Sequence, residues 1–336
     1  MVVSCSGSIP FRAMTPLLEI RNLSVRFDTE EGIVQAVDRV SLRVERGMTL
    51  GLVGESGCGK TVTCHSILRL HPPNGRIVGG QILFEEKDLL SLETSRLDAI
   101  RGHEIAMIFQ DPMSALNPVH TIGSQIVESL MLHQGMASPA ARTEALRLLE
   151  IVGIPEARQR LVEYPHQLSG GMNQRAMIAM ALSCRPKLLI ADEPTTALDM
   201  TIQAQILDLL GQLQGEYGMS IILVTHDLGV VAEMANRVVV MYSGRVVEEA
   251  STDDVFKRPA HPYTIGLLES LPRLDRDIDE LTLIKGSVPS PYDLPEGCHF
   301  APRCRFVSQR CKDLVPLLAP VGTGQTAACF HPQGLP

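Results

Sequence analysis

The chain begins with two segments in which apolar and polar residues alternate. Residues 17–27 (LLEIRNLSVRF) show this pattern, and residues 37–47 (VDRVSLRVERG) repeat it up to a glycine. A period of two is typical of a strand with one buried and one exposed face. The turn-like EEG at residues 30–32 separates the two segments. We therefore expect an antiparallel β subdomain near the start of the chain.

Continuous apolar runs follow and predict strands that are buried on both faces. They lie at residues 49–54, 187–192, 220–225 and 237–242. Helical patterns occupy residues 201–214 and 227–235 between the last three runs. Strands that alternate with helices form a mostly parallel sheet, so the predicted fold class is α/β.

A stretch in the middle of the chain contains only helical patterns. Residues 124–135 and 138–153 have helical spacing, and no strand pattern lies between them. We read this stretch as a helical insertion, and we place a helical subdomain at about residues 111–185 within a core of residues 17–256.

The two ends of the chain differ in texture from this core. Residues 257–336 are rich in proline and lack periodicity, which predicts a loop-rich C-terminal extension. Residues 1–16 have neither the basic start nor the apolar core of a secretory signal, and we expect a disordered leader there.

Composition narrows the class of partner. The 336 residues carry a formal net charge of −8, which argues against nucleic acid as a partner. The sequence has no apolar run that approaches the roughly 18–20 residues needed to cross a bilayer.

A glycine-rich segment connects the first buried run to a helical pattern. It reads GESGCGKT, residues 54–61. Glycines let backbone N–H groups wrap phosphates without Cβ clashes, and a helix start adds partial positive charge. The expected nucleotide contacts come from Gly54, Glu55, Ser56, Gly57, Cys58, Gly59, Lys60 and Thr61. In such a loop Lys60 reaches the β- and γ-phosphates and Thr61 directs its hydroxyl to Mg²⁺.

Polar residues follow three other predicted strands. Asp192 and Glu193 end the run at 187–192, His226 follows 220–225, and Gln110 follows IAMIF. Ligands bind at the carboxyl edge of parallel sheets. Asp192 is expected to hold Mg²⁺ and Glu193 to orient or deprotonate water. For His226 the alternative is a packed or capping histidine.

A second phosphate-seeking helix start lies more than a hundred residues after the first. Residues 168–184 (LSGGMNQRAMIAMALSC) place a polar, glycine-marked front before an apolar helix. The exposed N–H groups of such a start suit an anion.

Together these motifs resemble the ATP-binding subunits of ABC transporters over roughly residues 17–256. GESGCGKT matches the Walker A motif of a P-loop NTPase, Gln110 the Q-loop and LSGGMNQR the signature. LLIADE matches Walker B, Asp199 the D-loop and His226 the switch histidine. The resemblance implies catalytic roles for Glu193, His226 and Gln110, Mg²⁺ contacts from Thr61, Gln110 and Asp192, and adenine stacking on Phe27.

The resemblance also explains the two phosphate sites. In this family two ATPase domains pair head to tail, and the P-loop of one chain and the signature of the other enclose one ATP. The residues that it assigns to the ATP of the partner subunit are Leu168, Ser169, Gly170, Gly171, Gln174 and Asp199.

YPHQLSGGMNQR, HPYT and the late GC…PRC pattern are similar to the dipeptide/oligopeptide importer ATPases, whose D-type branch looks nearest. This likeness implies two integral-membrane permease subunits, a second related ATPase and an extracytoplasmic binding protein. It places the chain on the cytoplasmic face of the membrane, with the permease groove between Gln110 and residues 111–165. Nickel or another small solute is the alternative cargo.

Four cysteines crowd into the C-terminal extension: Cys298, Cys304, Cys311 and Cys329. Their spacing differs from the paired CxxC rhythm of zinc ribbons. Four thiolates in a loop-rich segment can hold a [4Fe–4S] cluster, and the resembled subfamily carries one there. We therefore expect such a cluster, with Zn²⁺ and no metal as the alternatives.

Two other functions are weighed against import. A non-transport ABC ATPase acting on nucleic acid or ribosomes is disfavoured, because a single cassette is present and only about 108 residues separate Thr61 from Ser169. A catalytically inactive cassette is disfavoured because Lys60, Glu193 and His226 are all present.

Overall fold

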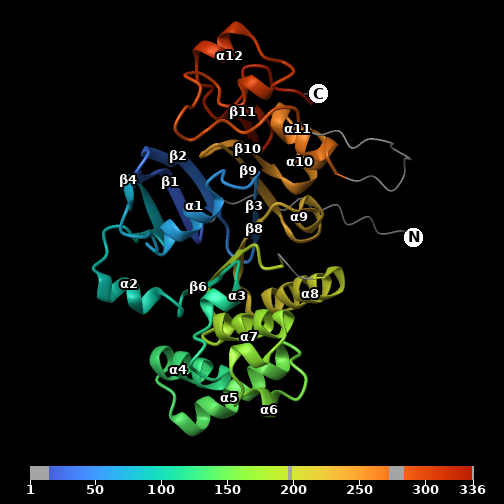
Figure 1. The fold of residues 1–336 in the computed structure, drawn as a ribbon. Coiled ribbons are helices and arrows are strands. Elements are labelled where there is room, and N and C mark those ends of the chain that lie inside the picture. Colours follow the sequence, from blue (N-terminus) through green and yellow to red (C-terminus); the bar gives the residue numbers. More distant parts are fainter. Residues whose placement is uncertain (1–14, 196–198, 272–283, 335–336) are drawn as a thin grey trace, which may run out of the picture.

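The protein is described by a computed structural model that covers residues 15–195, 199–271 and 284–334. The expected leader lies outside the described residues, apart from its last two positions. The molecule is elongated, with residues 112–182 at one end and residues 287–334 at the other (Figure 1).

A four-stranded antiparallel sheet forms the N-terminal subdomain. In spatial order it contains β2 (Gly32–Val44), β1 (Leu18–Thr29), β4 (Gly75–Phe84) and β5 (Lys87–Asp88). Leu18 pairs with Val44 and Thr29 with Gly32, which confirms the predicted antiparallel pair. The second strand starts at residue 32 rather than 37, because its early residues pair across the turn with the end of β1.

A second, larger sheet forms the centre of the molecule. In spatial order it contains β11 (Ala319–Gly322), β12 (Gln325–Ala327), β10 (Arg245–Ser251), β9 (Arg237–Tyr242), β3 (Thr49–Val53), β8 (Ser220–Thr225), β7 (Leu188–Asp192) and β6 (Ile105–Ile108). The strands from β9 to β6 run parallel to one another, as the apolar runs predicted. Every residue of β3, β7 and β8 is buried, because both faces of this sheet are covered.

Helices cover the central sheet. Helix α1 (Lys60–Ile67) buries Cys64 and Ile67 in one apolar cluster with residues of both sheets. Further helices are α2 (Thr94–Ile100), α8 (Met200–Tyr217) and α9 (Leu228–Met234). No helix in the described part of the chain is long and apolar enough to cross a bilayer.

The helical subdomain lies at the far end of the molecule from the C-terminus (Figure 1). It contains α3 (Pro112–Ala115), α4 (Ile122–Gln134), α5 (Ser138–Ile151), α6 (Ala157–Arg160), the 3₁₀ turn η1 (Pro165–Gln167) and α7 (Gly170–Leu182). Ile126, Leu149 and Met177 from three of these helices share one apolar cluster, which also includes residues of β6 and β7. The subdomain is therefore packed directly on the edge of the central sheet.

The described C-terminal residues form short elements joined by loops, and they pack on the core. Their short elements are α10 (Thr252–Lys257), α11 (Pro262–Glu269), η2 (Ala301–Arg303), α12 (Gln309–Asp313) and the strands β11 and β12. β12 pairs with β10, so the extension continues the central sheet.

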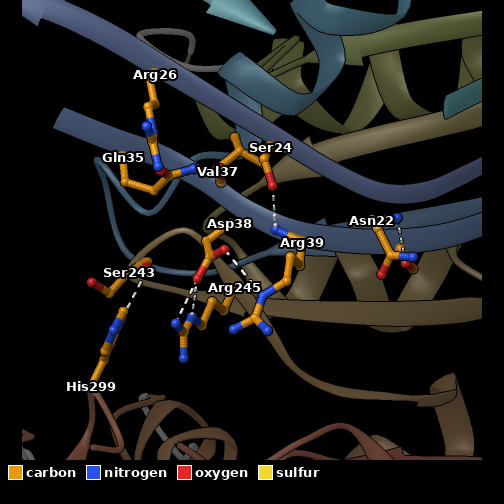
Figure 2. Close-up of polar contacts among 11 residues, drawn as sticks. Asn22, Ser24, Arg26, Gln35, Val37, Asp38, Arg39, Ser243, Arg245 and His299 are labelled. Atoms are coloured by element: carbon orange, nitrogen blue, oxygen red, sulfur yellow. Dashed lines mark hydrogen bonds and ion pairs between the residues drawn. The ribbon is translucent and has the colours of Figure 1, made fainter. Parts of the chain in front are cut away.

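Polar contacts tie the hairpin of β9 and β10 to its surroundings on both sides (Figure 2). Arg245 donates to Asp38 of β2 with an Nε–Oδ2 distance of 2.7 Å, and His299 Nδ1 lies 3.2 Å from the carbonyl oxygen of Ser243. The hairpin thus connects the antiparallel subdomain to the C-terminal extension.

Candidate active site

The glycine loop between β3 and α1 depends on backbone conformations that favour glycine. Gly54, Gly57 and Gly59 have φ values of 150°, 78° and 102°. A Cβ on Gly54 would come within 2.2 Å of the carbonyl oxygen of Met241, and a Cβ on Gly59 within 2.6 Å of that of Ala36. The loop is therefore pressed against the neighbouring backbone, while Ser56 and Gly57 remain exposed at its front.

Lys60 lies at the first position of α1 and folds over this loop. Its side chain is buried, and Nζ donates to the carbonyl oxygens of Gly54 at 2.7 Å and Glu55 at 3.1 Å. A buried ammonium needs such partners, and here they come from the loop itself. The sequence prediction that Lys60 belongs to the phosphate loop is consistent with this position.

The next residue of α1 contacts the end of β7. Thr61 Oγ1 donates to Asp192 Oδ1 at 3.1 Å. Burial raises the pKa of Asp192 to about 6, and the hydrogen bond from Thr61 partly offsets that rise.

Glu193 lies between two of the other predicted polar residues. Its Oε2 accepts a hydrogen bond from Gln110 Nε2 at 2.9 Å, and its Oε1 lies 3.5 Å from His226 Nδ1. Glu193 has a φ of 47°, an uncommon conformation for a residue other than glycine. The ends of β6, β7 and β8 therefore bring Gln110, Glu193 and His226 together at one edge of the sheet.

The signature segment forms a capped helix start, as its sequence suggested. Ser169 is the N-cap of α7, and its hydroxyl accepts from the backbone N–H of Met172 at 3.3 Å. Ser169 and Gly170 are exposed and Gly171 is half-buried, so the first N–H groups of the helix are accessible.

Two other residues that the resemblance assigned to the partner's ATP face inward. Leu168 belongs to the apolar cluster of the helical subdomain, and Gln174 is 2% exposed. Gln174 Nε2 donates to the carbonyl oxygen of Pro194. The geometry thus connects the signature helix to the segment that follows Glu193.

Asp199 is exposed and caps the N-terminus of α8, where it accepts from the N–H of Ile202 at 2.9 Å. The rest of the expected D-loop, residues 197–198, lies outside the described residues.

Phe27, the expected adenine platform, is half-buried near the end of β1. Its ring meets His71 edge-on with centroids 6.0 Å apart, and it packs closely against Gly75. The ring of Phe27 therefore packs against other residues of the protein.

Sequence reasoning missed two residues that contact the glycine loop from the extension. Arg303 forms an ion pair with Glu55, and the hydroxyl of Tyr263 accepts a hydrogen bond from the Glu55 N–H. The HPYT and PRC motifs that contain them were noticed, but no local pattern indicated which part of the core they would reach.

The predicted iron–sulfur cluster is wrong, and so is its zinc alternative. In the described ranges no group of three or more His, Cys, Asp or Glu side chains is arranged to hold a metal ion. Burial raises the pKa of the Cys298 and Cys304 thiols and brings that of Cys329 to about 11, because desolvation disfavours the thiolate. The Sγ atoms of Cys304 and Cys329 accept backbone N–H bonds from Phe306 and His331.

Comparison with known families agrees with the fold. The family described as "ABC transporter" matches residues 37–196, and the one described as "Oligopeptide/dipeptide transporter, C-terminal region" matches residues 247–311.

Curated relatives extend this match over nearly the whole chain. The oligopeptide transport ATP-binding protein AppD of Bacillus subtilis is 53% identical over 94% of this chain and 97% of its own length. The oligopeptide protein OppD of Salmonella typhimurium is 50% identical, over 94% of each chain. The dipeptide transport ATP-binding protein DppD of Haemophilus influenzae is 49% identical over 94% of this chain and 96% of its own.

Solved structures match the core. The dimeric ATP-binding cassette MJ0796 bound to ADP and Pi has a TM-score of 0.64 and 28% identity, covering 70% of this chain and 98% of that one. CbiO1 of Clostridium perfringens, part of the ABC transporter complex cbiONQ, has a TM-score of 0.60 and 26% identity, covering 72% and 91%.

The fold and the family matches define a P-loop ATPase of the ABC type. The chain belongs to the ABC transporter ATP-binding proteins of the oligopeptide/dipeptide transporter family, and its cofactors are accordingly ATP and Mg²⁺.

Proposed function

We propose that this protein is the ATP-hydrolysing motor of a peptide importer, and that it drives permease subunits encoded by other chains. The observation that carries the proposal is the contact of Thr61 with Asp192 beside Glu193, Gln110 and His226. The relatives reported above are named as oligopeptide and dipeptide transport ATP-binding proteins, which favours peptide cargo over nickel and over a nucleic-acid function.

The residues at the sheet edge suit a magnesium nucleotide. The Thr61 hydroxyl, the Asp192 carboxylate and the Gln110 side-chain carbonyl offer the oxygen donors that Mg²⁺ prefers, and the raised pKa of Asp192 reflects a buried charge that gains from a cation. Mg²⁺ bound there supplies positive charge to the phosphate oxygens. The glycine loop and Lys60 hold the phosphates through N–H groups and a fixed ammonium.

Glu193 is placed to act on the attacking water. Its carboxylate accepts the water proton while the water oxygen bonds to the γ-phosphorus and the bond to the β–γ bridging oxygen breaks. Gln110 donates to Oε2 of Glu193, and Oε1 lies near His226 Nδ1. His226, with a side chain 62% exposed, contacts the outer oxygens of the γ-phosphate.

The exposed start of α7 serves the nucleotide of a partner subunit. Ser169 and the N–H groups of Gly170 and Gly171 present partial positive charge to that γ-phosphate. ATP then joins two cassettes, and loss of the γ-phosphate releases them. Gln174 transmits this contact to Pro194, two residues after Asp192, while Asp199 faces the partner from the start of α8.

The helical subdomain offers a place for the permease. A groove of ≈ 610 Å³ lies among α4, α5 and α6, with Val127, Met131, Leu132, Leu161 and Val162 among its lining residues. Leu132 and Val162 are 74% and 69% exposed, which suits an apolar docking surface. Two permease subunits, an extracytoplasmic binding protein and a second, related ATPase complete the assembly, with this chain on the cytoplasmic face of the membrane. The domain division that we propose is the one expected from the sequence. The ATPase core begins at residue 17, the helical subdomain occupies about 111–185, and the extension begins at residue 257.

Reconstitution with the permease and binding protein in vesicles tests the transport role. Wild-type protein should support ATP-dependent uptake of a labelled peptide, and Lys60→Ala should abolish it. Uptake of nickel without uptake of peptide would reassign the cargo.

Mixing two inactive variants tests the shared site. In a homodimer, Lys60→Ala and Ser169→Arg subunits together form one intact ATP site and recover part of the activity. Recovery only after addition of a sister ATPase supports the heterodimer, and no recovery in either mixture contradicts the head-to-tail arrangement.

A further inference from the structure

An ion pair connects the C-terminal extension to the glycine loop. Arg303 Nη1 lies 2.7 Å from Glu55 Oε2, and Arg303 Nη2 lies 3.0 Å from Glu55 Oε1. Both carboxylate oxygens are therefore engaged by one guanidinium, the most directional form of such a pair. The Arg303 side chain is only 4% exposed and that of Glu55 29%, so solvent screens the contact weakly.

Arg303 is itself held in place by its surroundings. Its guanidinium lies 5.8 Å from the ring centre of Tyr242 and 6.0 Å from that of Phe300. It also donates to the carbonyl oxygens of Ile284 and Lys285 at 3.5 and 3.4 Å. The hydrogen bonds to Glu55 raise the pKa of Arg303 further above its ordinary value. Because these contacts fix the guanidinium, the position of Arg303 determines where the Glu55 carboxylate lies.

A second contact holds the backbone at the same residue. The Glu55 N–H donates to the hydroxyl of Tyr263 at 2.8 Å, and Tyr263 is fully buried. Tyr263 lies in the first turn of α11, and the start of this helix is held by the buried Glu248, which accepts from the N–H groups of Ala260 and His261 at 2.8 Å each. Both the side chain and the main chain of Glu55 are thus tied to the extension.

These contacts bear on the phosphate-binding groups of the loop. Glu55 follows Gly54, and Lys60 donates to the carbonyl oxygens of both. The orientation of these peptide groups, and with them the position of the Lys60 ammonium, depends on how Glu55 is held. Glu55 and His226 both line a cavity of ≈ 430 Å³. If the ion pair with Arg303 is lost, the Glu55 carboxylate therefore has room to turn toward His226, where its negative charge would repel phosphate.

We propose that Arg303, together with Tyr263, is a positioning residue through which the C-terminal extension sets the conformation of the phosphate loop and thereby the affinity for ATP. This rests on the proposed role of residues 54–61 in binding the phosphates. The extension is then part of the nucleotide site through its contacts with Glu55.

Steady-state ATPase kinetics of Arg303→Met test the proposal, with Arg305→Met as the matched control. Arg305 lies two residues away and pairs with Glu269 in a mostly exposed contact. We expect Arg303→Met to raise KM for ATP roughly tenfold or more with kcat changed less than about threefold, because a lost charge-assisted contact disturbs binding. Arg305→Met should leave both values as in the wild type, and Arg303→Lys should lie between them.

A double-mutant cycle separates positioning from general loss of structure. Glu55→Gln should raise KM by itself, and adding Arg303→Met should raise it little further, because both changes remove the same contact. Thermal unfolding of all variants is followed in parallel. A lower melting temperature with unchanged KM, or fully additive effects, would overturn the inference.

Lys60→Ala distinguishes this failure from failure of the phosphate loop itself. If Lys60→Ala abolishes ATP binding while Arg303→Met behaves like Arg305→Met, the positioning role falls and the ATP site stands. If Lys60→Ala binds ATP normally, both proposals fail.

Discussion

Thr61 and Asp192 are 131 residues apart in the chain, yet Thr61 Oγ1 donates to Asp192 Oδ1 at 3.1 Å. The contact follows from the order of the strands. β3 and β7 both flank β8 and run parallel to it, so their carboxyl ends meet at one edge of the sheet. The hydroxyl and the acidic pair are thereby brought together by the same fold that holds the glycine loop.

Removal of the Thr61 hydroxyl should lower hydrolysis. Thr61→Val keeps the shape of the side chain but loses a hydrogen bond to a charged group, worth about 1.5–3 kcal/mol. We expect kcat/KM to fall roughly 10–100-fold, measured over a range of Mg²⁺ concentrations. Thr61→Ser retains the hydroxyl and should stay within about threefold of wild type. Equal activity of the two variants would contradict the role of Thr61.

Neutralising Glu193 should separate binding from chemistry. Glu193→Gln is nearly isosteric but cannot accept a proton, so turnover should fall about 10²–10⁴-fold while ATP binding persists. Gln110→Ala removes one hydrogen bond to Glu193 Oε2 but keeps the carboxylate, so turnover should fall less, roughly tenfold. Single-turnover hydrolysis and nucleotide binding measured on the same samples provide the check. Unchanged hydrolysis in Glu193→Gln would exclude it as the base.

Substitutions of Phe27 distinguish a ring that stacks on adenine from a ring that only packs in the fold. Stacking of a base on an aromatic ring is worth about 1–3 kcal/mol, so Phe27→Ala should raise KM for ATP roughly 5–100-fold if the ring binds adenine. Phe27→Tyr keeps a ring and should bind ATP normally. A loss of thermal stability with unchanged KM would assign Phe27 to its packing against His71 and Gly75 alone.

The lowered pKa of His261 predicts how the free energy of unfolding changes with pH. Burial lowers its pKa from 6.5 to about 3, and its neutral Nδ1 accepts from the N–H of Tyr263 at 3.1 Å. Below pH 6.5 His261 binds a proton in the unfolded chain but stays neutral in the folded protein. The contribution to stability is therefore intact above pH 6.5 and is lost as the pH falls toward 3, by at most roughly 4–5 kcal/mol.

Urea unfolding between pH 7.5 and 4.5 measures this loss. His261→Asn keeps an acceptor but does not titrate, so its unfolding free energy should depend less steeply on pH. His120→Asn changes an exposed histidine and should retain the wild-type dependence. Identical pH profiles for wild type and His261→Asn would show that His261 does not stay neutral in the folded protein.

Short-range patterns were a reliable guide to much of the core. The apolar runs at 187–192 and 220–225 formed buried parallel strands, and the alternation at 17–27 formed most of an antiparallel strand. These elements are predictable because burial on one or two faces leaves a period that neighbouring residues record. The polar residues after these strands were predictable for the same reason, since parallel strands end at a common edge.

The cysteines show where spacing misleads. Cys298, Cys304, Cys311 and Cys329 do line one small cavity, but their spacing says nothing of the direction of each Sγ atom or of its protonation. In the part of the chain that the structure describes, no three of these side chains are arranged to hold a metal ion, and backbone N–H groups donate to two of the sulfurs. Side-chain direction and desolvation are set by packing, which no local motif records.

The sequence alone determined the chemistry of this protein, because the glycine loop, the acidic pair and the signature helix start are each encoded within a few consecutive residues. Only the tertiary structure decided that Arg303 and Tyr263 would meet Glu55, 248 and 208 positions away. Such meetings depend on how β10, α11 and the loops after them pack on the core, and packing is a property of the whole chain rather than of any segment.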